Sequence, residues 1–244
     1  MDCDNVSPRT AEAVMAETAK HGTLSIKRAY GDFTSPRLAG WRALLPALAI
    51  QPVQQFPYST RKKATDSALI IDAMDLLHST GTEVFCIVSS DSDFTRLAMR
   101  LREAGRRVYG IGARRTPQAF RHACDRFTYL EILADASPSE TPNTTQSGPV
   151  AVDQASEPEP MAEPEAVAPP LEPLLRAAVA ARAKDDGWAP LSSVGWYVVN
   201  THPTFDSRGY GYLKLGDLVR DQAYLEVDTR LDGSGTGHLW VRLR

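Results

Sequence analysis

The sequence predicts an α/β domain built on a parallel sheet, joined by a linker to a small winged-helix domain. Three observations lead to this prediction. Between residues 1 and 135, short apolar runs alternate with amphipathic stretches, a pattern typical of a parallel sheet flanked by helices. Residues 136–170 hold eight of the 17 prolines and neither an aromatic nor a basic residue. Residues 171–244 contain helical patterns followed by two alternating strands.

In the first domain, each expected strand is a short apolar run, and each expected helix has apolar residues three and four positions apart. The stretch "DFTRLAMRLREAG" keeps helical spacing from Phe94 to Leu101 and then reaches Gly105, a usual helix stop. The expected strands are residues 24–30, 83–89, 106–112 and 127–132, and the expected helices are residues 10–21, 37–48, 66–78, 94–104 and 117–125.

The linker cannot bury enough apolar surface to offset the entropy of ordering it, so we expect a disordered tether. Behind it, Leu239, Val241 and Leu243 lie on one face of an alternating strand, and "LDGSGTG" is a turn-rich hairpin connection. Three helices followed by a hairpin make a winged helix. Its expected helices are residues 174–186, 188–200 and 212–222, and its expected strands are residues 224–230 and 238–244.

Composition excludes several classes of protein. The chain has 244 residues, is 43% hydrophobic and carries a net charge of -3, and no apolar run approaches the roughly 20 residues of a membrane span. Cys3, Cys86 and Cys124 are odd in number and widely spaced, with no signal peptide before them. We therefore expect no disulfide framework, no zinc site and no membrane, and a cytoplasmic location.

Two aspartates lie one residue apart directly after an expected strand, in "SSDSDFTRLAMRLREAG". Two carboxylates about 4 Å apart repel by roughly 1 kcal/mol in water and about 4 kcal/mol at an effective dielectric near 20. A positive charge between Asp91 and Asp93 would offset this repulsion, so we expect one there. Their turn is expected at the carboxyl end of the strand, where ligands bind in an open parallel sheet.

Other turns supply further acidic residues. "MDCDNVSP" brings Asp2, Asp4 and Asn5, and Asp66 begins an expected helix. Any one of these aspartates could serve only as a helix cap. Three turns that present carboxylates to one sheet edge, without His or Cys, suit a hard cation such as Mg²⁺ or Mn²⁺. Asp72 follows Asp66 by six positions, about 240° around a helix, so it need not share the same ligand.

Four segments, in order, resemble the NYN domain, the PIN-like nuclease fold of the LabA-like group. They are "DCDNVSP", "KKATDSALIIDAMDLL", "CIVSSDSDFTRLAMRLREAGRRVYGIG" and "TPQAFRHACDRFTYLE". The resemblance implies a Rossmann-like sheet and a carboxylate cluster that binds one or two divalent metal ions. It also implies RNA hydrolysis by in-line attack of metal-activated water on the phosphodiester.

The resemblance also implies roles for individual residues. Ser90 and Ser92 stand where family members usually have glycine, which changes the turn or adds hydroxyl hydrogen bonds. The family's first strand, central to its sheet, is absent before Asp2, so we expect a version extended upstream of Met1 to be more stable and more active. The implied catalytic residues are Asp2, Asn5, Asp66, Asp91 and Asp93, the four aspartates being metal ligands, with Asp4 and Asp72 as polar groups that orient them.

Arginines support RNA as the substrate. The segment from Arg96 to Arg126 carries nine arginines against two acidic residues. Solvated helix faces account for many such charges, but those that flank the strand at residues 106–112 need not be helical. Arginines near a metal site are suited to holding phosphates. The candidates are Arg106, Arg107, Arg114 and Arg115.

The segment "DGWAPLSSVGWYVVNTHPTFDSRGYGYLKLGDLV" closely resembles the OST-HTH, or LOTUS, domain. That family is associated with RNA and with RNA-linked protein partners, so both kinds of partner are open. Arg208, with Tyr212, could offer phosphate and stacking contacts, whereas Phe205 and Tyr210 are expected to fill the core. The even charge of this domain argues against strong nonspecific binding.

Three alternative functions follow from the same sequence. "DCD" is similar to the nucleophile and acid pair of haloacid dehalogenase-type phosphatases. That family has a Ser/Thr motif before its lysine, whereas here Lys62 and Lys63 precede Ser89 and Ser90. A dehydrogenase is disfavoured because "YGIGARR" breaks the GxGxxG spacing. The third alternative is a non-catalytic RNA-binding or adaptor protein with a structural or degenerate metal site.

Overall fold

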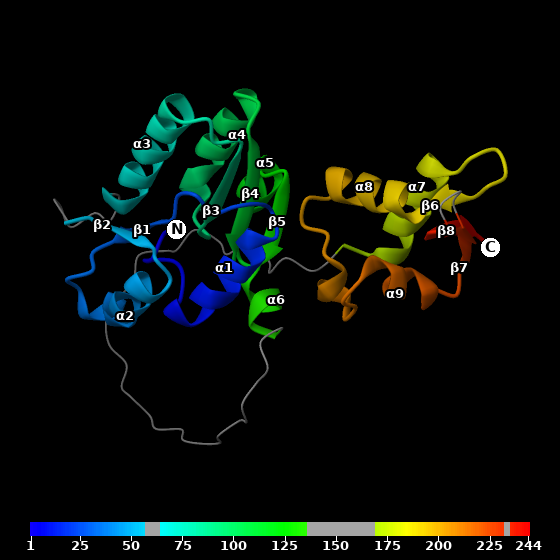
Figure 1. The fold of residues 1–244 in the computed structure, drawn as a ribbon, viewed down its shortest axis with the longest axis horizontal. Coiled ribbons are helices and arrows are strands. Elements are labelled where there is room, and N and C mark those ends of the chain that lie inside the picture. The colour runs from blue at the N-terminus through cyan, green and yellow to red at the C-terminus, as the bar shows by residue number, and fades with distance from the viewer. Residues whose placement is uncertain (57–63, 136–168, 232–234) are drawn as a thin grey trace, which may run out of the picture.

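A computed structural model describes residues 1–56, 64–135, 169–231 and 235–244 of the chain. They form an N-terminal α/β domain and a smaller C-terminal domain, which lies beside the edge strand β5 (Figure 1). The predicted fold class is confirmed. Residues 136–168 of the predicted tether lie outside the described residues, as do residues 232–234 of the predicted hairpin link.

The N-terminal domain has two parallel sheets. In the first, β1 (Arg28–Gly31) pairs with β2 (Gln51–Gln54); in the second, β3 (Val84–Val88), β4 (Arg107–Gly112) and β5 (Arg126–Tyr129) pair in that order. All the pairings are parallel. The carboxyl ends of these strands therefore meet at a common edge.

The first three residues join the two sheets. The Tyr30 N–H donates to the Met1 carbonyl at 2.9 Å, and the Cys3 N–H donates to the Tyr30 carbonyl at 3.0 Å. On the other side, the Asp2 N–H donates to the Val88 carbonyl at 3.0 Å. Asp2 thus lies between β1 and β3, at the centre of the combined sheet, where Figure 1 marks the N-terminus.

Helices cover both faces of the sheet. One core packs α3, α4 and α5 on β3–β5 around Phe94, Phe120 and Phe127; the other packs α1, α2 and α6 around Val14 and Trp41. All five expected helices are present, within a few residues of their predicted bounds. The helices are α1 (Ala11–Ala19), α2 (Ala39–Ala47), α3 (Ala64–Ser79), α4 (Thr95–Glu103), α5 (Gln118–Ala123) and α6 (Leu130–Asp135).

Three details of this domain differ from the expectations. The strand expected at residues 24–30 begins only at Arg28. The strand expected at residues 127–132 ends at Tyr129, and helix α6 begins at Leu130. An apolar run of this length suits a buried strand or a buried helix, so periodicity could not place the change. The edge strand β2 was not predicted because "QPVQ" contains proline and little apolar character, both compatible with an edge.

The C-terminal domain has the predicted three helices and hairpin. Leu175, Val194, Leu218 and Val241 meet in its core, as the predicted apolar face of the last strand requires. A short strand, β6, was not expected; it pairs with β8, which also pairs with β7, both antiparallel. The elements are α7 (Leu171–Arg182), β6 (Ala189–Pro190), α8 (Leu191–Thr201), α9 (Leu215–Arg220), β7 (Leu225–Leu231) and β8 (Gly237–Leu243).

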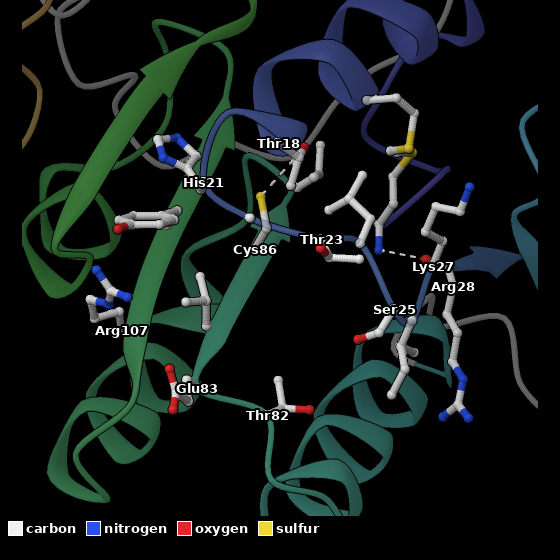
Figure 2. Close-up of a pocket in the computed structure, with 18 of the residues that line it drawn as sticks. Thr18, His21, Thr23, Ser25, Lys27, Arg28, Thr82, Glu83, Cys86 and Arg107 are labelled. Atoms are coloured by element: carbon white, nitrogen blue, oxygen red, sulfur yellow. Dashed lines mark hydrogen bonds between the residues drawn. The ribbon is translucent and has the colours of Figure 1, made fainter.

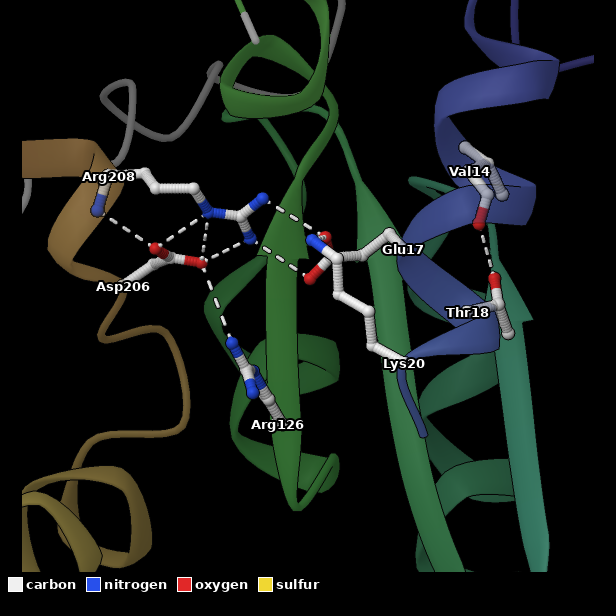
Figure 3. A network of polar contacts seen from close by, with 7 residues as sticks. All are labelled: Val14, Glu17, Thr18, Lys20, Arg126, Asp206 and Arg208. Carbon is white, nitrogen blue, oxygen red and sulfur yellow. Dashed lines mark hydrogen bonds and ion pairs between the residues drawn. The ribbon is translucent and has the colours of Figure 1, made fainter. Parts of the chain in front are cut away.

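The loop after α8 contacts the N-terminal domain. The Phe127 N–H, on β5, donates to the Pro203 carbonyl at 2.8 Å. Beside it, the Arg208 guanidinium donates to the carboxylate of Glu17 on α1 (Figure 3). The two domains therefore share a polar interface.

Candidate metal centre

The turn after β3 explains how two aspartates come together. Asp91 has an extended backbone, with φ -86° and ψ 137°, and its Oδ1 accepts the Asp93 N–H at 2.9 Å. This bond starts the 3₁₀ helix Ser92–Phe94, which leads into α4. Asp91 is thus a helix cap, as its position suggested, and the same turn keeps the half-buried Asp93 carboxylate close to it.

A third carboxylate reaches this turn from a distant segment. Asp66 lies in the first turn of α3. One carboxylate oxygen from each of Asp66, Asp91 and Asp93 lies within 4.8 Å of the other two. An all-oxygen donor set of this size fits a hard divalent cation, because Mg²⁺ and Mn²⁺ prefer carboxylate ligands. The structure therefore brings together three of the four predicted metal ligands.

Asp2, the fourth predicted ligand, is not part of this three-carboxylate group. Its side chain is completely buried. Its Oδ2 accepts hydrogen bonds from Asn5 Nδ2 at 2.6 Å and Ser89 Oγ at 2.8 Å, and its Oδ1 accepts the Asp4 N–H at 3.1 Å. Asn5, another predicted catalytic residue, thus contacts Asp2, and both Asp2 oxygens accept hydrogen bonds.

Ser89 connects Asp2 to the three-carboxylate group. It is fully buried, and its Oγ donates to Asp2 while accepting the Asp91 N–H at 3.1 Å. This residue was not predicted from the sequence, because a serine at the end of a strand carries no distinctive spacing. Its position two residues before Asp91, at the end of the expected strand, was the one available signal.

Ser90 stands where the family resemblance implies a glycine. Ser90 Oγ accepts the Ala113 N–H at 2.8 Å, which ties the turn after β3 to the turn after β4. The expected extra hydroxyl hydrogen bond is therefore confirmed for Ser90. At Gly112 the two turns approach so closely that a Cβ atom would lie 2.5 Å from the Ser89 carbonyl oxygen. Only glycine fits there.

Asp4 and Asp72, the two predicted orienting residues, lie in different surroundings. Asp4 accepts a hydrogen bond from Thr65 Oγ1 at 3.0 Å, so it contacts the residue next to Asp66. Asp72 instead pairs with the guanidinium of Arg28 and the hydroxyl of Tyr30. Six residues of helix turn its side chain away from Asp66, and its contacts support α3 against β1.

The predicted phosphate-binding arginines lie at opposite ends of β4. Arg114 and Arg115 follow β4 at its carboxyl end, on the same edge as the carboxylates. The Arg114 N–H donates to the Glu131 carboxylate at 3.0 and 3.1 Å. Arg106 and Arg107 lie at the start of β4, on the opposite edge. Their contact with RNA stays a prediction, but they are not beside the three-carboxylate group.

In the C-terminal domain, Arg208 is engaged by carboxylates. Its guanidinium donates to Glu17 and to Asp206, and its side chain is only 17% exposed. Phe205 is buried and lies 5.7 Å from the Tyr210 ring, centroid to centroid. The expectation that these two aromatics fill the core is confirmed.

A separate cavity of about 430 Å³ lies beside Met1 (Figure 2). Its lining includes His21, Lys27 and Arg107, but none of the acidic residues predicted for the site. The Lys27 ammonium donates to the Leu48 carbonyl at 2.6 Å, and the His21 ring lies 4.2 Å from that of Tyr109. This cavity is therefore distinct from the candidate metal centre.

Comparison with protein families agrees with the fold and the acidic cluster. Residues 1–131 match the NYN domain. The chain belongs to the NYN-domain family. Residues 162–236 match the OST-HTH/LOTUS domain, so the predicted order of the two domains is confirmed. NYN is a PIN-like nuclease family, and the OST-HTH domain behind it indicates RNA binding.

No curated protein matches the chain. Among solved structures, an uncharacterized protein from Nitrosomonas europaea is 36% identical, with 38% of this chain and 92% of that chain covered and a TM-score of 0.29. A fragment, residues 175–257, of a Chromobacterium violaceum protein is 38% identical, with 32% of this chain and 83% of that chain covered and a TM-score of 0.28.

Among the described residues of the NYN protein, no helix is long and apolar enough to cross a membrane.

Proposed function

We propose that this NYN protein is a divalent-metal-dependent ribonuclease that hydrolyses RNA phosphodiester bonds, with its OST-HTH domain as the recognition module. The observation that carries the proposal is the convergence of Asp66, Asp91 and Asp93 within 4.8 Å. An anionic cluster of this kind is compatible with a bound cation.

Asp66, Asp91 and Asp93 would hold Mg²⁺ or Mn²⁺. When bound, such an ion would neutralise the charge that develops on the phosphate oxygens and activate a water molecule for in-line attack. The protein's own part is to keep its ligands in place. The Asp91 cap on the Asp93 N–H and the bond from the Asp91 N–H to Ser89 would fix this turn.

Asp2 would act mainly through its neighbours. The family resemblance makes it a ligand, but three hydrogen bonds already engage its oxygens in this structure. We therefore assign Asp2 to holding Ser89, and Asn5 to holding Asp2. Through Ser89 this chain of contacts reaches the backbone of Asp91.

RNA would approach along the carboxyl edge of the sheet. Arg115 is exposed and Arg114 is half-buried, and both are close in sequence to Ala113, whose N–H donates to Ser90 Oγ in the turn after β3. Guanidinium groups in this position are suited to phosphates. We assign the nuclease to residues 1–135 and recognition to residues 171–244, with 136–170 between them, in a cytoplasmic protein.

The direct test is to incubate the full chain with labelled single-stranded and duplex RNAs in Mg²⁺, in Mn²⁺ and in EDTA. We expect cleavage that requires the metal and that Asp91→Asn abolishes. Cleavage that continues unchanged in EDTA would contradict the metal mechanism. RNA binding without cleavage in either metal would instead support a non-catalytic adaptor.

A further inference from the structure

The C-terminal domain has an open groove between α8 and the β7–β8 hairpin. Its volume is about 670 Å³, and its lining includes Leu191, Trp196, Leu215, Arg230, His238 and Trp240. We propose that this tryptophan groove binds unpaired bases of single-stranded RNA, with Arg182 and Lys184 beside it on the phosphates. The inference deepens the proposed function, because it rests on RNA recognition by the OST-HTH domain.

Two tryptophans make the groove suitable for bases. The Trp196 side chain is 61% exposed, an unusual state for the largest apolar side chain, and Trp240 on the opposite wall is half-buried. Leu231 at the groove is 73% exposed. Indole rings offer a flat surface on which any base can stack. The base of a duplex is already stacked and paired, so single strands fit better.

Two cations that form no ion pair with any described carboxylate lie against these tryptophans. The Arg182 guanidinium lies 4.9 Å from the Trp196 ring centroid and 5.3 Å from that of Tyr197, and the Lys184 ammonium lies 4.8 Å from the Trp240 centroid. Neither cation forms an ion pair within the described part of the chain. The buried Arg182 Nε also has no hydrogen-bond partner there. Both cations are therefore available to an anionic ligand.

The charge of the groove also favours an anionic ligand. Its described lining contains Arg230 and His238 but no carboxylate. Arg230 is already paired with Asp186 and Asp228, at 3.3 Å each, so Arg182 and Lys184 supply the unbalanced charge. An apolar floor between unbalanced cations suits a chain of flat bases joined by phosphates.

The other candidate surface of this domain is less accessible. Its arginine, Arg208, donates to Glu17 and Asp206, and a phosphate could take the guanidinium only by displacing both carboxylates. The tryptophan groove requires no such displacement. The contrast between an engaged arginine and two unengaged cations decides between the two surfaces.

The test is fluorescence anisotropy of a labelled, unstructured 12-nucleotide RNA with the full chain in EDTA, which prevents metal-dependent cleavage. We expect Trp196→Ala and Arg182→Gln each to weaken binding by about 5- to 100-fold. Arg176→Gln is the matched control, because Arg176 lies on the same helix and stacks on Tyr224 at 4.8 Å but pairs with Glu172. Its effect should stay below about twofold.

Unchanged affinity in both groove variants would overturn the inference, as would equal binding of a 12-base-pair duplex. Loss of binding in Arg208→Gln alone would place RNA on the other surface. If the groove variants keep RNA affinity but lose an affinity-captured protein, the groove is a protein site and the inference is wrong. Absence of metal-dependent cleavage by the wild-type chain would refute the nuclease proposal, whereas weakened binding in the variants would still support the groove.

Discussion

Arg208 of the OST-HTH domain donates two hydrogen bonds to the Glu17 carboxylate of the NYN domain, at 3.0 and 2.9 Å. Glu17 is only 2% exposed. The same guanidinium contacts Asp206 at 2.6 Å, and Arg126 on β5 lies 3.6 Å from that carboxylate (Figure 3). Two arginines and two buried carboxylates therefore alternate across the domain interface.

Burial and pairing oppose one another at these groups. Burial alone would raise the pKa of Glu17, but hydrogen bonds from Arg208 and Lys20 outweigh it and hold that pKa below the ordinary value of 4.5. Burial also opposes ionisation of Asp206, and its bonds with Arg208 likewise hold its pKa below 3.8. Removing one partner of such a buried pair costs about 3 to 5 kcal/mol. The NYN domain thus supplies Glu17 and Arg126, and the OST-HTH domain supplies their partners of opposite charge, Arg208 and Asp206.

The first prediction concerns this coupling. Glu17→Gln and Arg208→Gln should each loosen the docked arrangement, and the double variant should be less destabilised than the sum of the single ones by about 1 to 3 kcal/mol. Urea unfolding measures the coupling, and small-angle X-ray scattering should show a larger radius of gyration for each variant. The exposed pair Arg176 and Glu172 is the control, with a coupling of about 0.5 kcal/mol or less. A Glu17 cycle no larger than this would contradict the role of the interface.

The second prediction concerns pH. Because the folded-state pKa values of Glu17 and Asp206 lie below 4.5 and 3.8 respectively, their ionic contribution is complete above these ordinary values. It is lost as the pH falls through the lowered folded-state values. Glu17→Gln should therefore reduce the loss of stability on acidification from pH 6. Thermal unfolding of both proteins across this range measures it, and parallel pH profiles would show that Glu17 contributes nothing.

The third prediction concerns the candidate metal centre. Asp66→Asn and Asp91→Asn should abolish metal-dependent RNA cleavage without lowering the melting temperature in EDTA, since each removes a charge from a crowded anionic group. Asparagine at position 91 can still cap the turn. Mn²⁺ should raise the melting temperature of the wild type but not of the variants.

The exposed Asp75 on the same helix as Asp66 gives a matched control. Asp75→Asn should retain cleavage and its response to Mn²⁺. If Asp91→Asn unfolds in EDTA while Asp75→Asn does not, the carboxylate would be structural, and the assignment of a metal ligand would be wrong.

The fourth prediction concerns Ser89. Ser89→Ala removes a donor from Asp2 and an acceptor from the Asp91 N–H, so it should lower the free energy of unfolding by about 1 to 3 kcal/mol. Cleavage should fall as the turn loses its anchor. Ser92→Ala, at an exposed neighbour, should change stability by less than about 0.5 kcal/mol. Equal effects of the two substitutions would show that the Asp2–Ser89–Asp91 connection is unimportant.

Local patterns in the sequence were enough to predict most helices and strands and to select the acidic residues of the candidate site. Apolar periodicity is a local property, so it located β3, β4 and the helices, and the pairing of Asp91 with Asp93 in one turn followed from their spacing. The change from β5 to α6 at Leu130 was not readable, because a short buried run has no period of its own. The proline-rich composition predicted a domain boundary after residue 135, where the first described part of the chain beyond α3 ends.

Which acidic residues meet depends on tertiary packing, which the sequence did not reveal. Asp66 joins Asp91 and Asp93 because α3 begins near the turn after β3, whereas Asp72, on the same helix, faces Arg28. Tertiary packing also decided that Arg208 meets Glu17, which lies 191 residues away along the chain. Spacing in the sequence states which side chains share a face of one element. Contacts between elements depend on how those faces pack, and that packing is set by the whole core rather than by any local pattern.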